Sequence, residues 1–281
     1  MDTVTLRNGN TMPQIMLGSF QMKSQDEMDG IVRAAVQGGA FGFDTSPSYK
    51  TEEPLAKAIH SVMKEDSTIK REDFFLTSKI DSWQMIAKKG DIRSFVDSIL
   101  KKTCLEYWDL LLIHWPQPEN FVDTWKCMEK LYEEGIVKNI GICNCQVRQF
   151  RLLEQNANIC PFVAQNEIHP MNIEQEVYEY CKEHDIVLEA YSPIARMLPM
   201  VKNNALLNIL AAKYNMSVAQ LMLKWHVQRG LVPVVKTSNP KRVEENTNLG
   251  PVVLEDADMK AISGLDQHFK IFMESRCCPG F

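Results

Sequence analysis

The sequence lacks the features that would place a protein in a membrane, on a nucleic acid or outside the cell. No apolar run approaches the roughly 18 residues that span a bilayer. The opening Met1-Asp2-Thr3-Val4 has neither the basic nor the apolar region of a secretion signal. The formal net charge of −5 disfavours nucleic-acid binding, which usually needs a basic surplus. We therefore expect a cytoplasmic protein that binds neither membrane nor nucleic acid.

The cysteines show no pattern typical of disulfides or of a structural metal. They are scattered through a long chain, and Cys143-x-Cys145 has no second pair at zinc-ligand spacing. We expect reduced thiols and no metal. The eight are Cys104, Cys127, Cys143, Cys145, Cys160, Cys181, Cys277 and Cys278.

Glycine-rich phosphate loops are also missing. Neither G-x-G-x-x-G nor a P-loop occurs, and the first short apolar run is followed only by Leu17-Gly18-Ser19-Phe20. A doubly wound open sheet usually carries such a loop after its first strand, so this fold is the second choice.

What the sequence does contain is a regular alternation of short apolar runs and longer segments of helical periodicity. The runs predict buried parallel strands, and eight of them suggest closure into a (β/α)8 barrel. Helical segments between them include 26–37, 52–64 and 92–103. The eight runs are 15–17, 41–43, 74–77, 109–113, 137–142, 162–165, 186–190 and 232–235.

A β-hairpin precedes the barrel. Val4-Thr5-Leu6 and the segment 12–16 flank a turn that contains Asn8-Gly9, which is a strong hairpin signal. No linker interrupts the chain. We therefore expect an α/β fold, a (β/α)8 TIM barrel with an N-terminal hairpin, over a single domain 1–281.

Ionisable residues stand at the ends of three successive predicted strands. Asp44, Lys79 and His114 are equally spaced along the chain, so we expect them at one level of neighbouring strands, and Tyr49 lies in the loop above that rim. An ammonium beside a phenol lowers its pKa and makes it a better acid at neutral pH. Lys79, held by Asp44, suits Tyr49 as an acid, and His114 suits a substrate oxygen. A structural ion pair with ordinary loop residues would also explain these residues, and the spacing leaves both interpretations open.

The motifs around these residues resemble those of the aldo-keto reductase family. The segments are Phe43-Asp44-Thr45-Ser46-Pro47-Ser48-Tyr49, Ser78-Lys79 and Leu112-Ile113-His114-Trp115-Pro116. The resemblance extends to about Leu265 and implies Tyr49 as proton donor, Asp44 and Lys79 as its tuning pair and His114 as the residue that orients the carbonyl. It is closest to short-loop bacterial members of the diketogluconate reductase type.

The resemblance also implies an NADPH site. It assigns Asn144 and Gln165 to the nicotinamide carboxamide, and Tyr191 of Ala190-Tyr191-Ser192-Pro193 to the face of the ring. It assigns Lys236, Thr237 and Arg242 to the 2′-phosphate, with Glu245 and Asn246 near the adenine. Gly18, Ser19, Cys143 and Ser192 complete the set of cofactor-binding residues.

Several positions depart from the family pattern. Cys143 replaces the usual Ser, which weakens one expected hydrogen bond to the carboxamide. Val235 replaces the usual Pro before Lys236, and Ala164 stands where Asn is common. Ile80-Asp81-Ser82-Trp83 differs from the usual Lys-Leu-Trp start.

The loops that cover the substrate in the family are short in this sequence, so we expect an open pocket. Phe20, Trp83 and Trp115 are candidate walls, because ligand pockets are largely apolar and aromatic. The Cys277-Cys278 tail offers no sequence argument for a redox role.

The resulting prediction is an NADPH-dependent oxidoreductase that reduces aldehydes or ketones to alcohols, acting as a monomer on a small-molecule carbonyl substrate. An NADPH-binding regulatory protein with little turnover is the alternative. A barrel hydrolase is weaker, since it needs two rim carboxylates and only Asp44 is well placed, with Glu167 and Glu189 as doubtful partners.

Overall fold

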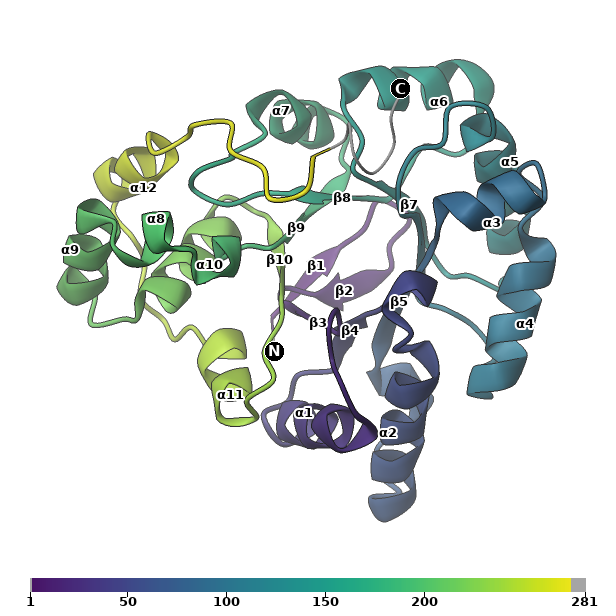
Figure 1. The fold of residues 1–281 in the computed structure, drawn as a ribbon, viewed down its shortest axis with the longest axis horizontal. Coiled ribbons are helices and arrows are strands. Elements are labelled where there is room, and N and C mark those ends of the chain that lie inside the picture. The colour runs from purple at the N-terminus through teal and green to yellow at the C-terminus, as the bar shows by residue number, and fades with distance from the viewer. Residues whose placement is uncertain (1, 274–281) are drawn as a thin grey trace.

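A closed barrel of eight parallel strands forms the centre of the protein (Figure 1). The computed structural model describes residues 2–273. The ring closes between the last strand and the first, where Val234 and Val235 pair with Met16 and Leu17. The strands are β3 (Met16–Gly18), β4 (Gly42–Asp44), β5 (Phe75–Ile80), β6 (Leu110–Ile113), β7 (Ile140–Cys143), β8 (Val163–Glu167), β9 (Val187–Tyr191) and β10 (Val232–Val235).

Helices surround this barrel, as Figure 1 shows. None of the helices among residues 2–273 is long and apolar enough to cross a bilayer. They are α1 (Gln25–Gln37), α2 (Glu52–Glu65), α3 (Ser82–Ala87), α4 (Arg93–Thr103), α5 (Phe121–Glu133), α6 (Val147–Asn156), α7 (Gln175–Glu183), α8 (Pro199–Lys202), α9 (Ala205–Lys213), α10 (Val218–Gln228), α11 (Lys241–Thr247) and α12 (Asp256–Ser263), with 3-10 turns η1 (Pro47–Tyr49), η2 (Arg71–Asp73) and η3 (Ala195–Met197).

The first helix shows why these segments are helical. The hydroxyl of Ser24 caps α1 by accepting the backbone N–H of Glu27. The buried positions Met28, Ile31, Val32 and Ala35 repeat at helical spacing and form one face. This face packs on the barrel, so tertiary burial selects the helix that the periodicity predicted.

The predicted alternation is confirmed, with shifts at the strand ends. β5 runs on to Ile80, beyond the predicted end at 77. β7 begins at Ile140 although the apolar run begins at Val137, which forms only an isolated bridge with Trp108. Between this bridge and β7, Lys138 still donates to the carbonyl of Trp108 and the carbonyl of Asn139 accepts from Leu111, while the buried Asn139 side chain bonds Asn8 of the hairpin and the carbonyl of Asp109.

The predicted hairpin covers the end of the barrel where the strands begin. It consists of β1 (Thr3–Thr5) and β2 (Thr11–Pro13), with Gly9 at a positive φ of 88° in the turn. Arg7 donates to the carbonyls of Cys160 and His184, which precede β8 and β9. The hairpin thus closes the base and leaves the opposite end, where the strands finish, for polar groups.

One glycine is fixed by close packing inside the barrel wall. A Cβ on Gly141 in β7 would lie 2.2 Å from the carbonyl oxygen of Val163. Gly141→Ala should therefore lower the free energy of unfolding by about 1–3 kcal/mol, because the β7–β8 ladder must move apart. Urea unfolding measures this.

Gly30 in α1 is the matched control. A Cβ there meets only the side chain of Pro240, at an ordinary contact distance of 3.5 Å. Gly30→Ala should stabilise the protein by about 0.5–1 kcal/mol, as helix propensity dictates. Equal effects of the two substitutions would contradict the packing assigned to Gly141.

Candidate active site

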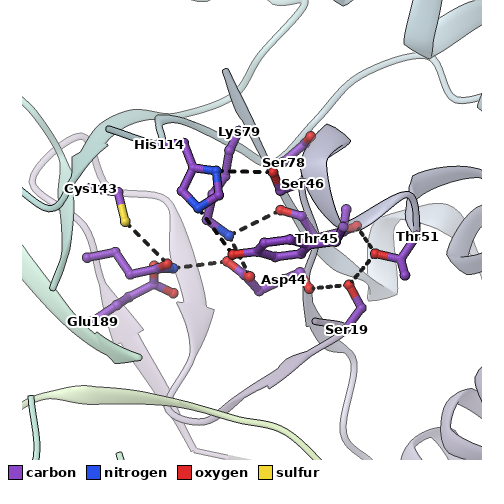
Figure 2. Close-up of polar contacts among 12 residues, drawn as sticks. Ser19, Asp44, Thr45, Ser46, Thr51, Ser78, Lys79, His114, Cys143 and Glu189 are labelled. Atoms are coloured by element: carbon purple, nitrogen blue, oxygen red, sulfur yellow. Dashed lines mark hydrogen bonds and ion pairs between the residues drawn. The ribbon is translucent and has the colours of Figure 1, made fainter. Parts of the chain in front are cut away.

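A buried ion pair lies at the open end of the barrel interior. The Nζ of Lys79 is 2.6 Å from Oδ1 of Asp44 and donates a second bond to the carbonyl of Thr45 at 3.1 Å. The Lys79 side chain has no solvent exposure. Figure 2 shows Lys79 directed toward Asp44, with His114 beside it. The predicted contact between Asp44 and Lys79 is present.

The strand register explains how these residues meet. Asp44 is paired with Thr77, and Lys79 with Leu112, so each residue lies two positions beyond the partner of the previous one. Strands in a barrel tilt relative to its axis, and this stagger brings staggered residues to one layer. The equal spacing in the sequence therefore reflects the shear of the barrel and not direct pairing.

Tyr49 and His114 complete the group. The short turn η1 begins after Ser46, whose hydroxyl accepts the backbone N–H of Ser48, and it carries Tyr49 over the rim. The Tyr49 hydroxyl is 3.3 Å from Nε2 of His114, and Nζ of Lys79 is 5.0 Å from the centre of the Tyr49 ring. All four residues predicted as catalytic thus lie together.

The electrostatics of this group differ from the expectation in one respect. Burial raises the pKa of Tyr49 above its usual value, while Lys79 acts to lower it and does not overcome the burial. Burial also acts to lower the pKa of Lys79, but the neighbouring Asp44 carboxylate outweighs it, and the pKa is raised. Lys79 is a permanent cation here, and Tyr49 stays a neutral phenol that can donate its proton.

A further carboxylate, Asp81, belongs to the site. Its Oδ1 is 2.5 Å from Nδ1 of His114, and its Oδ2 accepts the backbone N–H of Ser48 at 2.8 Å. In the sequence, Asp81 stands out only as a departure from the family pattern. A carboxylate two residues after a strand-end lysine is a weak signal, because its partner His114 lies far along the chain.

The predicted nicotinamide residues lie beside this group. Asn144 has a left-handed φ of 59°, and its amide donates to the carbonyl of His114 at 2.8 Å. The hydroxyl of Tyr191 donates to Oδ1 of Asn144 at 2.7 Å. Ser192 follows with a φ of 50°. These bonds hold the Tyr191 ring at the rim, close to His114.

Gln165 lies deeper, in a polar layer of the barrel interior. Its Nε2 donates to Oδ2 of Asp44 at 2.9 Å and to Oε2 of Glu189 at 2.8 Å, while the thiol of Cys143 donates to its Oε1 at 3.6 Å. Burial raises the pKa of Glu189 to about 8 and also raises the pKa of the Cys143 thiol. Figure 2 shows Cys143 and Glu189 on the side of the group opposite Thr51.

Gly18 and Ser19 occupy the end of β3. The Ser19 hydroxyl donates to the carbonyl of Asp44 at 2.9 Å and shares a hydrogen bond with Thr51 at 2.7 Å. A Cβ on Gly18 would lie 3.8 Å from Cβ of Lys236, so the ends of β3 and β10 approach closely here. Both predicted residues therefore border the segment predicted to hold phosphate.

The segment predicted to hold the 2′-phosphate presents cations at the surface. Lys236 is one third exposed, and its Nζ is 3.5 Å from a carboxylate oxygen of Glu27. Arg242 on α11 is exposed, and its guanidinium makes no ion pair or hydrogen bond to the described part of the chain. Thr237 is buried and bonds Asn239, which shapes the turn into α11. Asn246 is buried on this helix and Glu245 is exposed.

Aromatic side chains surround the rim. The Phe20 ring lies 5.0 Å from the Tyr49 ring and 6.2 Å from the Phe272 ring, and Phe272 also lies 6.0 Å from Tyr191. Trp115 lines a small cavity with Asn144, Tyr191 and Phe272. Phe20 and Trp115 thus lie at the rim, and their role as walls of the substrate pocket stays a prediction.

Phe272 is a wall that the sequence analysis did not identify. The buried carboxylate of Glu167 accepts the backbone N–H groups of Ile271 and Phe272 at 2.6 and 2.9 Å, which holds this segment over the rim. Cys277 and Cys278 lie outside the described residues. The six other cysteines are free.

Trp83 is not part of this site, which corrects the prediction. α3 begins directly after Asp81 and turns the Trp83 side chain outward, where it is 55% exposed and packs edge-on against Phe95. It lines a groove of about 500 Å³ on the outside of the barrel, between α2 and α4.

Comparison with known proteins identifies the family. The model of the aldo/keto reductase family matches residues 14–267. The chain belongs to the aldo/keto reductase family. A glyoxal reductase of Bacillus subtilis is 36% identical over 270 residues, covering 96% of this chain and 95% of the relative. The methylglyoxal reductase DkgA of Escherichia coli is 34% identical, covering 94% and 93%.

Solved structures agree with this assignment. An aldo-keto reductase of Bombyx mori in complex with NADP has a TM-score of 0.90 at 27% identity, covering 98% of this chain and 96% of that one. Membership of the aldo/keto reductase family makes the chain an NADP-dependent carbonyl reductase with a TIM barrel. The predicted family, fold, enzyme class and cofactor are confirmed, and the comparisons give no support to the regulatory alternative.

The buried acid Glu189 generates a prediction about stability. Its pKa of about 8 in the folded protein lies above the usual carboxyl value, so the folded state holds a proton that the unfolded chain releases. The associated stability is present below the usual pKa and is lost as the pH rises toward about 8.

Glu189→Gln should therefore reduce the loss of unfolding free energy between roughly pH 5 and pH 9, measured by urea unfolding across that range. The substitution Glu119→Gln, at an exposed position, should keep the wild-type slope. An unchanged slope in Glu189→Gln would show that this carboxyl is ionised in the fold.

Proposed function

We propose that this aldo/keto reductase reduces small reactive aldehydes, of the 2-oxoaldehyde class on which its named relatives act, with Tyr49 as the proton donor. The observation that carries the proposal is the contact of the Tyr49 hydroxyl with His114 above the Lys79–Asp44 ion pair. A neutral phenol beside a fixed cation can give up its proton, because the cation stabilises the phenolate that forms.

The residues of the chain have separable tasks in this reaction. When bound, NADPH supplies a hydride to the carbonyl carbon. Tyr49 donates its hydroxyl proton to the carbonyl oxygen, and Lys79 stabilises the resulting phenolate from 5.0 Å below the ring. Asp44 keeps Lys79 charged and in place through the 2.6 Å contact. The aromatic groups of Phe20, Trp115 and Phe272 exclude water from the reacting carbonyl.

The acceptors and cations of the predicted cofactor site fit an NADPH molecule. The Oδ1 of Asn144 and the Oε1 of Gln165 each accept one bond from the protein, which leaves a lone pair for the N–H of a carboxamide. The exposed guanidinium of Arg242 and the ammonium of Lys236 suit a phosphate. The thiol of Cys143 donates its hydrogen to Gln165, so Cys143 contributes little to binding of the carboxamide.

The arrangement of the carboxylates argues against a hydrolase. Glu189 is fully buried beneath the tetrad of Asp44, Tyr49, Lys79 and His114. Glu167 uses both oxygens to hold Ile271 and Phe272. Neither faces Asp44 across the rim as a second catalytic carboxylate would.

The remaining assignments belong to the same proposal. We propose a single domain over residues 1–281 that acts as a monomer in the cytoplasm and binds no nucleic acid. The buried apolar residues form one cluster, and the net charge of −5 supports the last point.

Tyr49→Phe tests the proton donor. The substitution removes one oxygen and keeps the ring, so kcat for reduction of methylglyoxal should fall by about 10²–10⁴-fold. Consumption of NADPH measures the rate, and fluorescence titration of NADPH checks that the cofactor still binds. Near-normal turnover in the variant would refute the assignment.

Lys236→Met with Arg242→Ala tests the phosphate contacts. Each charge-assisted bond contributes roughly 1.5–3 kcal/mol, so the Kd for NADPH should rise about 10- to 1,000-fold or more while the Kd for NADH changes little. Lys260→Met on α12, away from this segment, is the control. An equal loss for both cofactors would place the 2′-phosphate elsewhere.

A further inference from the structure

The carboxylate of Asp81 is fixed against one nitrogen of His114. Its Oδ1 is 2.5 Å from Nδ1 of the imidazole, and the hydroxyl of Ser46 donates to the same oxygen at 3.4 Å. The Oδ2 accepts the N–H of Ser48, and the backbone N–H of Asp81 donates to Gln84 at 2.9 Å. The Ser46 hydroxyl and the Ser48 N–H both donate to this carboxylate, which is the environment of an ionised acceptor.

We infer that Asp81 is a positioning residue that fixes the tautomer of His114 and makes the imidazole the source of the proton that Tyr49 delivers. This inference rests on the proposed reductase function and adds a third member, Asp81, to the His114–Tyr49 contact. None of the residue roles that the family resemblance implies includes Asp81.

The tautomer follows from hydrogen-bond chemistry. An ionised carboxylate only accepts, so Nδ1 of His114 must carry a hydrogen. A neutral imidazole then has a bare Nε2, and this atom faces the Tyr49 hydroxyl at 3.3 Å. Neutral His114 therefore accepts from Tyr49 and cannot donate to a substrate oxygen. Only the imidazolium can donate from Nε2.

In this step a proton passes from His114 through Tyr49 to the substrate. The carbonyl oxygen takes the hydroxyl proton of Tyr49, and the phenolate takes the Nε2 proton of the His114 imidazolium. His114 becomes neutral and keeps its Nδ1 hydrogen on Asp81, which stays ionised throughout. A proton from solvent then restores the imidazolium at the small part of the side chain, 11%, that stays exposed. A carboxylate that orients and stabilises an imidazolium has the same task in hydrolytic triads.

The charges around His114 give the direction of the pH dependence. Burial lowers the pKa of His114; Asp81 acts to raise it, Lys79 on β5 acts to lower it and Asp44 on β4 acts to raise it. Burial also acts to raise the pKa of Asp81, but the bonds from His114 and Ser48 outweigh it and lower the value. The reduction rate should fall as rising pH removes the imidazolium, and loss of Asp81 should move this fall to lower pH.

Asp81→Asn tests the relay, because an amide neither stabilises the imidazolium nor requires a hydrogen on Nδ1. We expect kcat for methylglyoxal to fall by about 10- to 100-fold with little change in KM and in the Kd for NADPH. The falling limb of the pH–rate profile should move to lower pH. Asp81→Glu, which restores a carboxylate, should recover part of kcat.

Gln84→Leu is the control for a merely structural role. It removes the bond that holds the backbone of Asp81 and leaves the carboxylate on His114. This variant should keep the wild-type pH profile. Nitrogen NMR of labelled protein should find His114 protonated on Nδ1 in the wild type and in Gln84→Leu, and no longer fixed in Asp81→Asn.

Two results would overturn the inference. One is wild-type kcat and an unmoved pH profile in Asp81→Asn; the other is a loss of rate with the profile and tautomer of the wild type, which would make Asp81 a structural residue only. The NMR measurement needs no turnover. A chain that reduces no carbonyl but shows the fixed tautomer would thus refute the proposed function and leave the Asp81 geometry standing.

Discussion

The ammonium of Lys79 is buried in the barrel, and the Asp44 carboxylate at 2.6 Å makes its charge tolerable there. Desolvating two charges costs several kcal/mol each, so a buried pair of this kind persists only with good geometry and further hydrogen bonds. The structure supplies these bonds from the carbonyl of Thr45 and the amide of Gln165. The pair gives the site a permanent positive charge next to a neutral phenol.

The polar layer around this pair depends on the strand ends and their stagger. Asp44, Lys79, Gln165 and Glu189 come from different strands and form one connected set of contacts. A raised pKa on Glu189 keeps that carboxyl protonated near neutral pH, which avoids a second negative charge beside Asp44. The barrel thus presents the Lys79 cation at the layer where Tyr49 and His114 meet.

Much of this arrangement follows from local sequence. The alternation of short apolar runs with segments of helical periodicity identified the eight strands. The motifs placed the four residues of the tetrad, because each stands at a strand end or one short turn beyond it. The strand limits were less predictable: the apolar run begins at Val137, but Val137 forms only an isolated bridge with Trp108 and the strand begins at Ile140.

Long-range contacts account for what the sequence did not reveal. Asp81 acquires its role from His114, and Phe272 is held over the rim by Glu167. Both contacts join segments far apart in the chain and leave no local pattern. Trp83 was wrongly assigned for the converse reason: its aromatic character suits a pocket wall, but the start of α3 turns it outward.

The central claim is that the Lys79–Asp44 pair serves catalysis and is not needed for folding. The double variant Asp44→Asn, Lys79→Met tests it most directly, since near-isosteric neutral replacements of a buried pair are often neutral in stability. Measuring unfolding free energy, NADPH binding and turnover together, we predict a folded protein that binds NADPH and has lost about 10²–10⁴-fold in kcat. A folded variant that reduces methylglyoxal at the wild-type rate would contradict the account.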